Sequence, residues 1–425
     1  MRFLSKTAGL GGSYGDSPGT FFVSEILPDG TPLPFEGKFS PARNAQDSGG
    51  FCRFAMRKSG WTTTAALSEI ARKMHASSKR FNAAGNKDKN ATTVQLASCL
   101  GAKPAELLSL NLRGIEILGA WESNSRVRIG ELLGNRFRIK HLGRVPGSAA
   151  KAGKGRAKPM PKAQEKRTVS KIRKETGGFF LNYFGRQRFG SLRQNTHEIG
   201  VHLLRGDFKA ACEAYLFSSP GAEPESYRIA RRELEGSLDF KKALGYFPRH
   251  LSGERQILSH LAVRPSDYAG ALRAMPRSTL LLFVHAVQSH VFNMTLDLRH
   301  DAADFRPSLV SGEHYCMEKG GFFIPGLLSP VPDKKSGGKN IALRLVGHEA
   351  KSLNPYESEA MDSLSIKPED FKVPGMPELS ARGGFRSAYA KCVDFSFDGE
   401  WFEFSLQSGS YATVALEEYL KEKKI

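Results

Sequence analysis

The order of structural patterns along the chain constrains its fold most: strand patterns occur at both ends and helical patterns in between. Near the N-terminus, the apolar segment 21–26 predicts a short strand. Near the C-terminus, apolar residues alternate with polar ones on both sides of Asp398-Gly399, which is typical of a β-hairpin. They are Val393, Phe395, Phe397, Phe402, Phe404 and Leu406. An amphipathic helix is expected over 412–420, and residues from about 206 to 300 look helical. One discontinuous domain carrying an insertion explains this order more simply than two domains in tandem.

Shorter elements are predicted within these parts. Apolar periodicity indicates helices over 62–73 and 279–298, and strands are expected near 81–84 and 93–100. Val127 and Ile129, then Phe137 and Ile139, alternate with basic residues and predict a hairpin with a solvated, basic outer face. Short strands are also expected at 321–325 and 341–346.

The composition indicates a packed protein with an affinity for polyanions. A chain of 425 residues suggests two domains or three, and 40% of its residues are hydrophobic. Its net charge of +19 favours nucleic acid, whose phosphates Lys and Arg neutralise. A cationic protein without such a ligand is the alternative.

Cysteine usage and hydropathy favour the cytoplasm. The five cysteines are scattered and form no Cys-x-x-Cys, so neither a disulfide framework nor a zinc ribbon is expected. The N-terminus lacks an apolar signal core, and the longest apolar run, 279–287, is too short to span a membrane. We therefore expect no membrane association.

The segment 144–174 is rich in Lys, Gly, Ala and Pro. Apolar periodicity disappears there until Val169, which is typical of a mobile basic loop. It could grip an RNA backbone or be a solvated spacer.

Asp88 is the first candidate for chemistry. It lies between Lys87 and Lys89 on a short connection between two apolar stretches, where a carboxylate can stay ionised and act as nucleophile or general base. A solvated turn is the alternative interpretation.

Aromatic and basic residues are interleaved over 182–190. Rings can stack on bases and guanidinium groups can hold phosphates, so Arg186 and Arg188 are candidate substrate ligands. Asn182 could hydrogen-bond the edge of a base. An ordinary aromatic core segment with two surface arginines is the alternative interpretation.

Phe21 and Tyr411 are aromatic residues on or beside strands, where a core position is the common role. The small neighbours Gly409, Ser410 and Ala412 would let the Tyr411 ring reach into a cleft.

The sequence favours neither a metal nor a cofactor. The pairs His197 with His202 and His285 with His290 are five residues apart, not the four that place two ligands on one helix face. There is no phosphate-binding Gly-rich loop with a Lys, so we expect no metal site and no small-molecule cofactor.

Five segments, in order along the chain, resemble motifs of the TruD family of tRNA pseudouridine synthases. The Asp88 segment is similar to Gly-x-Lys-Asp-Lys-x-Ala-x-Thr-x-Gln at Gly85, Lys87, Asp88, Lys89, Ala91, Thr93 and Gln95. The other four are 21–25, which resembles Phe-x-Val-x-Glu, then 182–190, 285–293 and 409–413. Gly19-Thr20 departs from the family pattern and leaves the register of Phe21 against Phe22 open, while position 411 carries Tyr, a ring that the motif also admits.

The resemblance implies an α+β pseudouridine synthase fold, with a mixed, mainly antiparallel sheet, flanking helices and a TruD-specific α/β insertion. The catalytic domain would comprise 1–205 and 381–425, with the basic loop 144–174 in it, and the insertion would be 206–380. RNA would bind between the two. The helical stretch 206–275 looks more like archaeal or eukaryotic members than bacterial ones.

The resemblance also implies an activity and a site. Asp88 would be catalytic, and Phe21, Asn182 and Tyr411 would contact the target nucleotide, which would be uridine 13 of tRNA. Lys87, Arg186 and Arg188 are expected to help bind this substrate. The alternatives are a non-catalytic RNA-binding protein or RNA chaperone, and a metal-dependent RNA hydrolase, which the lack of clustered ligands disfavours. The oligomeric state is left open.

Overall fold

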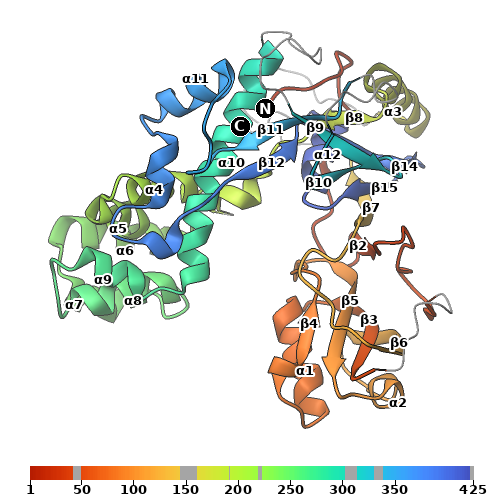
Figure 1. Cartoon of the computed structure of the whole chain (residues 1–425), viewed down its shortest axis with the longest axis horizontal. Coiled ribbons are helices and arrows are strands. Elements are labelled where there is room, and N and C mark those ends of the chain that lie inside the picture. The colour runs from red at the N-terminus through yellow and green to blue at the C-terminus, as the bar shows by residue number, and fades with distance from the viewer. Residues whose placement is uncertain are drawn as a thin grey trace. The chain divides into compact units, whose positions relative to one another are not determined.

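The computed structural model describes residues 1–41, 49–143, 160–190, 192–218, 223–301, 314–329 and 338–421. The chain forms two compact units (Figure 1). The sheet unit comprises Phe3–Asn182, Met317–Pro325 and Tyr389–Ile425, and the helical unit comprises Met1–Arg2, Tyr183–Cys316 and Gly326–Ala388. Helices and a mixed sheet together make this an α+β protein, as predicted.

A nine-stranded sheet organises the sheet unit. Its strands run in the order β14-β15-β7-β2-β5-β3-β6, while β1 pairs with β7 and β4 with β5. Only β2 and β5 are parallel among the registers of this sheet, so it is mixed and mainly antiparallel. The bounds are β1 Ser13–Tyr14, β2 Phe21–Ile26, β3 Phe51–Ser59, β4 Phe81–Ala83, β5 Thr92–Leu100, β6 Ile115–Ser123, β7 Gly134–Leu142, β14 Val393–Phe397 and β15 Trp401–Gln407. A separate pair joins β8 (Phe179–Leu181) to β13 (Tyr389–Lys391).

Helices cover one face of this sheet. α1 (Thr63–Lys73) begins where the Thr62 side chain accepts the Ala65 N–H, and it buries Ile70 with apolar residues of β3 and β5. α12 (Ala412–Leu420) packs its Tyr419 ring near Phe402 of β15, with the centroids 5.9 Å apart. The register across β15, β7, β2, β5 and β3 places both helices on the same face, since directly paired residues point to the same side.

The predicted strand at the N-terminus, the helix over 62–73, the two strands that flank Asp88 and the C-terminal hairpin with its helix are all confirmed. The sheet unit also contains α2 (Pro104–Leu108) and η2 (Ser78–Arg80).

The predicted hairpin between 127–129 and 137–139 is wrong. Residues 127 and 129 belong to no strand, and β7 pairs with β15 and β2 instead. Val127 is 1% exposed and Ile129 is 92% exposed, although a strand would turn both to the same face. Alternation over so few residues did not distinguish a strand from a loop that buries one side chain.

The segment 144–174 divides in two. Residues 144–159 lie outside the described residues, whereas Lys162–Thr176 form α3 rather than a loop. Glu165, Val169, Ile172 and Thr176 are buried at helical spacing, and Gly177 ends the helix in a left-handed conformation. Val169, where periodicity returns in the sequence, is thus the middle residue of a helix.

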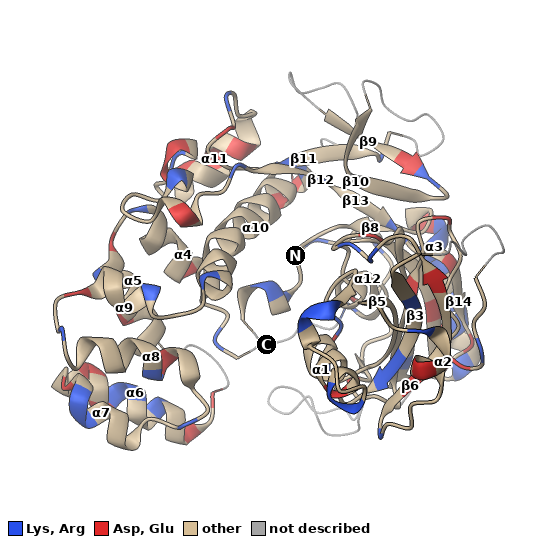
Figure 2. Ribbon diagram, turned by 60° about the horizontal axis from the view of Figure 1, so that its bottom comes forward, with Lys and Arg blue, Asp and Glu red and all other residues tan. Residues whose placement is uncertain are grey.

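The helical unit is built around α10 (Arg277–Asp301), which buries Leu280, Val284, Val287 and Val291 as predicted. Its other helices are α4 Thr196–Leu204, α5 Phe208–Leu216, α6 Glu225–Ser237, α7 Phe240–Tyr246, α8 Ser252–Leu261, α9 Tyr268–Arg273 and α11 Pro355–Ser363, with η3 Arg186–Phe189, η4 Pro368–Lys372 and η5 Pro377–Leu379. In α6, acidic and basic residues are interspersed (Figure 2). β11 (Ile341–Leu345) pairs with β12 (Gly384–Ser387) and with the start of β9 (His314–Lys319). The chain crosses between the units within β9 and β10 (Phe322–Ser329).

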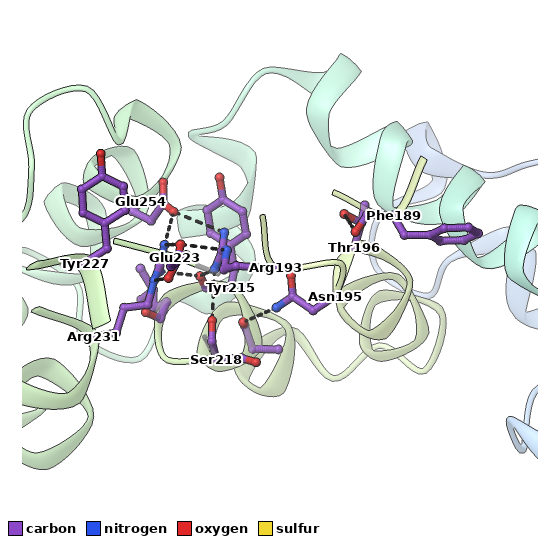
Figure 3. Close-up of polar contacts among 12 residues, drawn as sticks. Phe189, Arg193, Asn195, Thr196, Tyr215, Ser218, Glu223, Tyr227, Arg231 and Glu254 are labelled. Atoms are coloured by element: carbon purple, nitrogen blue, oxygen red, sulfur yellow. Dashed lines mark hydrogen bonds and ion pairs between the residues drawn. The ribbon is translucent and has the colours of Figure 1, made fainter. Parts of the chain in front are cut away.

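Three buried charged residues, Glu223, Arg231 and Glu254, cluster with the partly buried Arg193 in the helical unit (Figure 3). The Arg231 guanidinium donates to Glu223 at 2.9 Å and to Glu254 at 2.8 Å. Arg193 lies 3.5 Å from Glu223 and 3.3 Å from Glu254. Two cations and two carboxylates thus neutralise one another, and backbone carbonyls of Tyr215 and Leu216 accept the remaining Arg231 N–H groups. This network joins α6 and α8 to the end of α5.

Candidate active site

Asp88 lies on the connection 84–91, at a gap between two strands. β3 pairs along the whole of β5, while β2 pairs with Thr92–Val94 and β4 with Ala97–Cys99. β2 and β4 therefore share the other edge of β5 and leave Gln95 and Leu96 without a strand partner on that side. The connection leaves the sheet at this gap.

Glu25 of β2 fills the gap and holds the connection. Its buried carboxylate accepts the Leu96 N–H at 2.7 Å and forms an ion pair with the Lys87 ammonium. The Lys87 side chain is 11% exposed. The residue before Asp88 is therefore anchored to the middle of the sheet.

Lys58, near the end of β3, also holds this connection. Its ammonium donates to the carbonyl oxygens of Trp61 at 2.7 Å, Lys87 at 3.2 Å and Asp88 at 2.9 Å. Burial lowers the pKa of Lys58 to about 8, Asp88 opposes this change and Lys87 adds to it. Sequence reasoning missed Lys58. The signal was available, because Phe54, Met56 and Lys58 alternate along β3 toward the helical face, where a charge is unexpected.

Thr63 of α1 and Gln95 of the motif fix the backbone of the connection. The Thr63 hydroxyl accepts the Lys87 N–H at 2.8 Å and donates to Gln95 Oε1 at 2.8 Å. The Gln95 amide donates to the Gly85 carbonyl at 3.2 Å. Gln95 thus has a structural role in the motif, and α1 helps to fix the connection through Thr63.

Asp88 itself is exposed, and its Oδ1 accepts the N–H of Asn90 at 3.1 Å. Glu25, Lys58, Thr63 and Gln95 hold the connection through the Lys87 side chain and through backbone atoms, not through the Asp88 carboxylate. The arrangement presents an oxygen nucleophile or base to solvent on a rigid support.

Phe21 lies on the same face as Glu25, because the two are an even number of residues apart in β2. Its partly exposed ring meets Phe137 edge-on at 6.4 Å. Tyr411, also partly exposed, is the residue before α12. β15 ends at Gln407, opposite Gly134, which is itself opposite Ile26. Tyr411 therefore comes just after β15 ends, at the same end of the sheet as the Glu25–Lys87 ion pair. α12 lies on the same face of the sheet as Phe21.

The remaining predicted ligands follow β8. Asn182 is 0% exposed and ends the long first segment of the sheet unit. Arg186 and Arg188 belong to the helical unit, in η3. Arg186 is exposed, whereas Arg188 donates to the Ser289 hydroxyl of α10 at 3.0 Å and lies 5.7 Å from the Phe184 ring centroid.

Within the described ranges, no group of three or more His, Cys, Asp or Glu residues could hold a metal ion. In the same ranges, we find no helix with the length and apolarity of a membrane span.

The fold matches that of a known protein over almost the whole chain. A crystal structure of a Methanosarcina mazei protein named for tRNA pseudouridine synthase D (TruD) superposes with a TM-score of 0.72 at 27% sequence identity, covering 99% of this chain and 96% of that one. The fold therefore places the chain among α+β isomerases with the pseudouridine synthase fold.

The sequence comparisons identify the family. The model of tRNA pseudouridine synthase D (TruD) matches residues 1–419, and the chain belongs to this family of tRNA pseudouridine synthases. A "Probable tRNA pseudouridine synthase D" of Methanosarcina barkeri is 29% identical over 99% of this chain and 95% of its own. A relative of the same name from Methanopyrus kandleri is 32% identical over 86% of this chain and 84% of its own. These archaeal relatives agree with the predicted resemblance.

Proposed function

We propose that this protein converts uridine to pseudouridine in tRNA, at position 13, with Asp88 as the catalytic carboxylate. The observation that carries the proposal is the exposed Asp88 carboxylate on a connection that Lys58, Thr63 and the Glu25–Lys87 ion pair hold rigidly. A reaction on the ribose needs a carboxylate whose position does not drift.

The reaction breaks the bond between uracil N1 and ribose C1′, turns the base, and forms a bond between C5 and C1′. C5 then loses its proton to solvent and N1 takes one up from solvent, so atoms and electrons balance without a redox partner. Asp88 would either attack C1′ or remove the 2′ proton to pass through a glycal. The Lys58 ammonium, which the Asp88 charge favours, would hold the connection during either step.

The uridine must leave its stack before Asp88 can reach C1′. Unstacking costs a few kcal/mol, and stacking on an aromatic ring returns about 1–3 kcal/mol per base. We assign this stacking to Phe21 and Tyr411, and base and phosphate contacts to Asn182, Arg186 and Arg188. We infer that Lys87 both contributes to substrate binding and supports the connection that carries Asp88.

Two further expectations, on domain division and on cellular compartment, are also proposals. The division into a catalytic domain of 1–205 with 381–425 and an insertion of 206–380, with a basic segment 144–174, stays a proposal. So does the cytoplasm as compartment, which the five cysteines support because all of them are unpaired thiols.

The test is Asp88→Asn. We expect normal folding and tRNA binding but a loss of pseudouridine formation of at least about a thousandfold, because an amide can neither attack nor accept the proton. The measurement is tritium release from tRNA labelled at uridine C5. A transcript with cytidine at position 13 should release none at that site.

Asp29→Asn is the matched control. Asp29 also accepts the N–H two residues on, from Thr31 at 2.8 Å, as Asp88 does from Asn90. The control should keep full activity. Near-normal activity of Asp88→Asn would refute the assignment, and tRNA binding without tritium release by the unmodified protein would favour the RNA-binding alternative.

A further inference from the structure

The connection between β6 and β7, residues 124–133, exposes an apolar side chain at its tip. Ile129 is 92% exposed, more than any other large apolar residue in the described ranges. Exposing an isoleucine on a loop gains nothing for folding, because its apolar surface stays in water. Such a side chain is available to contact an apolar surface of a ligand.

The tip is held rigidly rather than frayed. Arg53 of β3 donates to the Ser125 hydroxyl at 3.0 Å and pairs with Glu131 at 2.8 Å. Glu131 in turn accepts the Arg128 N–H at 2.8 Å. Gly130 provides the positive φ of +82° that the turn requires. The isoleucine is therefore presented by a fixed loop.

Two cations flank the exposed isoleucine. Arg126 and Arg128 are both exposed, and neither side chain has an ion-pair partner among the residues that the structure describes. Together with Arg53, Ser125 and residues 129–131 they line a shallow hollow. An apolar tip beside free guanidinium groups fits nucleic acid, whose bases are apolar on their faces and whose phosphates are anionic.

The tip is bonded to the connection that carries Asp88. The Gly130 N–H donates to the Ala84 carbonyl at 2.7 Å. Ala84 precedes Asp88 by four residues, and four residues span at most about 14 Å. A strand of RNA that places one nucleotide at Asp88 therefore has its neighbouring nucleotides within reach of the tip.

We infer that Ile129 is a wedge that enters the base stack beside the target uridine and favours its everted form, while Arg126 and Arg128 bind the flanking phosphates. Ile129 is thus a positioning residue, not a catalytic one, and this inference rests on the proposed function. Apolar side chains that unstack base steps are a known device of proteins that deform nucleic acids.

The test compares Ile129→Ser with the conservative Ile129→Leu and with Leu108→Ser, which removes an apolar side chain that is 51% exposed on α2. Each variant is assayed for single-turnover pseudouridine formation on two tRNAs: one natural, and one in which the base opposite the target uridine cannot pair. We expect Ile129→Ser to slow the natural substrate about tenfold, as loss of one base contact does. The mispaired tRNA should recover most of this loss, and the Leu variant and the control should behave as the parent.

Each other outcome is decisive. An unchanged rate for Ile129→Ser on natural tRNA overturns the wedge, as does an equal loss on both tRNAs, which would indicate a structural defect. If Ile129→Ser keeps the parental rate but no longer self-associates as the parent does, the tip is a protein interface. If the parent forms no pseudouridine at all, the proposed function falls and the wedge falls with it.

Discussion

The two units use buried charge differently. In the helical unit, Arg193 and Arg231 form ion pairs with Glu223 and Glu254, so the two positive and two negative charges cancel within one network. In the sheet unit, Lys58 and Lys87 are held with a single buried carboxylate, Glu25, and the second anion nearby is the exposed Asp88. The balanced set joins helices. The unbalanced set leaves one cation whose counter-charge is the candidate catalytic group.

The largest effect that separates the two sets is expected for Arg231→Met. The substitution leaves two buried carboxylates with one cation, which should cost about 3–5 kcal/mol of unfolding free energy. Activity per folded molecule should not change, because the network only stabilises. Denaturant unfolding and an active-fraction assay measure the two quantities.

Arg232→Met is the control for that experiment. Arg232 is the next residue, is 68% exposed and pairs with Glu225, so its loss should cost at most about 1 kcal/mol. Equal costs for both variants would show that the buried network contributes nothing beyond a surface pair.

A smaller loss of stability, but a loss of activity as well, is expected for Lys87→Met. It leaves Glu25 buried without its cation, at a cost of about 2–3 kcal/mol, and frees the connection that presents Asp88. Adding Glu25→Gln should restore part of the unfolding free energy but not the rate of pseudouridine formation. If the double variant regains full activity, the ion pair is not what positions Asp88. Lys89→Met, one residue beyond Asp88 and exposed, should keep its stability.

The smallest effect concerns pH. The pKa of Lys58 is lowered from 10.5 to about 8 in the folded protein. Between these values the unfolded chain binds the proton more tightly, so this group's contribution to stability rises with pH. Deprotonation leaves two N–H donors for three carbonyl acceptors, which should loosen the connection. We therefore expect the rate to fall by about threefold or more above pH 8 without loss of stability from this group.

Lys58→Met checks this interpretation. The variant should be less active at pH 7 and should lack the decline above pH 8. A decline that persists in the variant would assign it to another group.

The sequence identified the candidate catalytic residue and most elements, because the evidence was local. The period of two in β15 and the helical spacing in α10 predict those elements without any distant partner, and the motif around Asp88 is contiguous. Lys58 was missed because its three carbonyl partners come from two separate connections. The false hairpin at 127–129 has the same cause, since the partners of β7 lie more than a hundred residues away in either direction.

The sequence by itself determined the family, the α+β class and the identity of Asp88 as the group to test. Only the tertiary structure decided that Lys87 pairs with Glu25 and that Lys58 binds the backbone of the connection. It also decided that Ile129 is exposed on a neighbouring loop. The reason is physical: the energy of a charge or an apolar group depends on whether water reaches it, and burial is set by residues that meet only when the chain has folded.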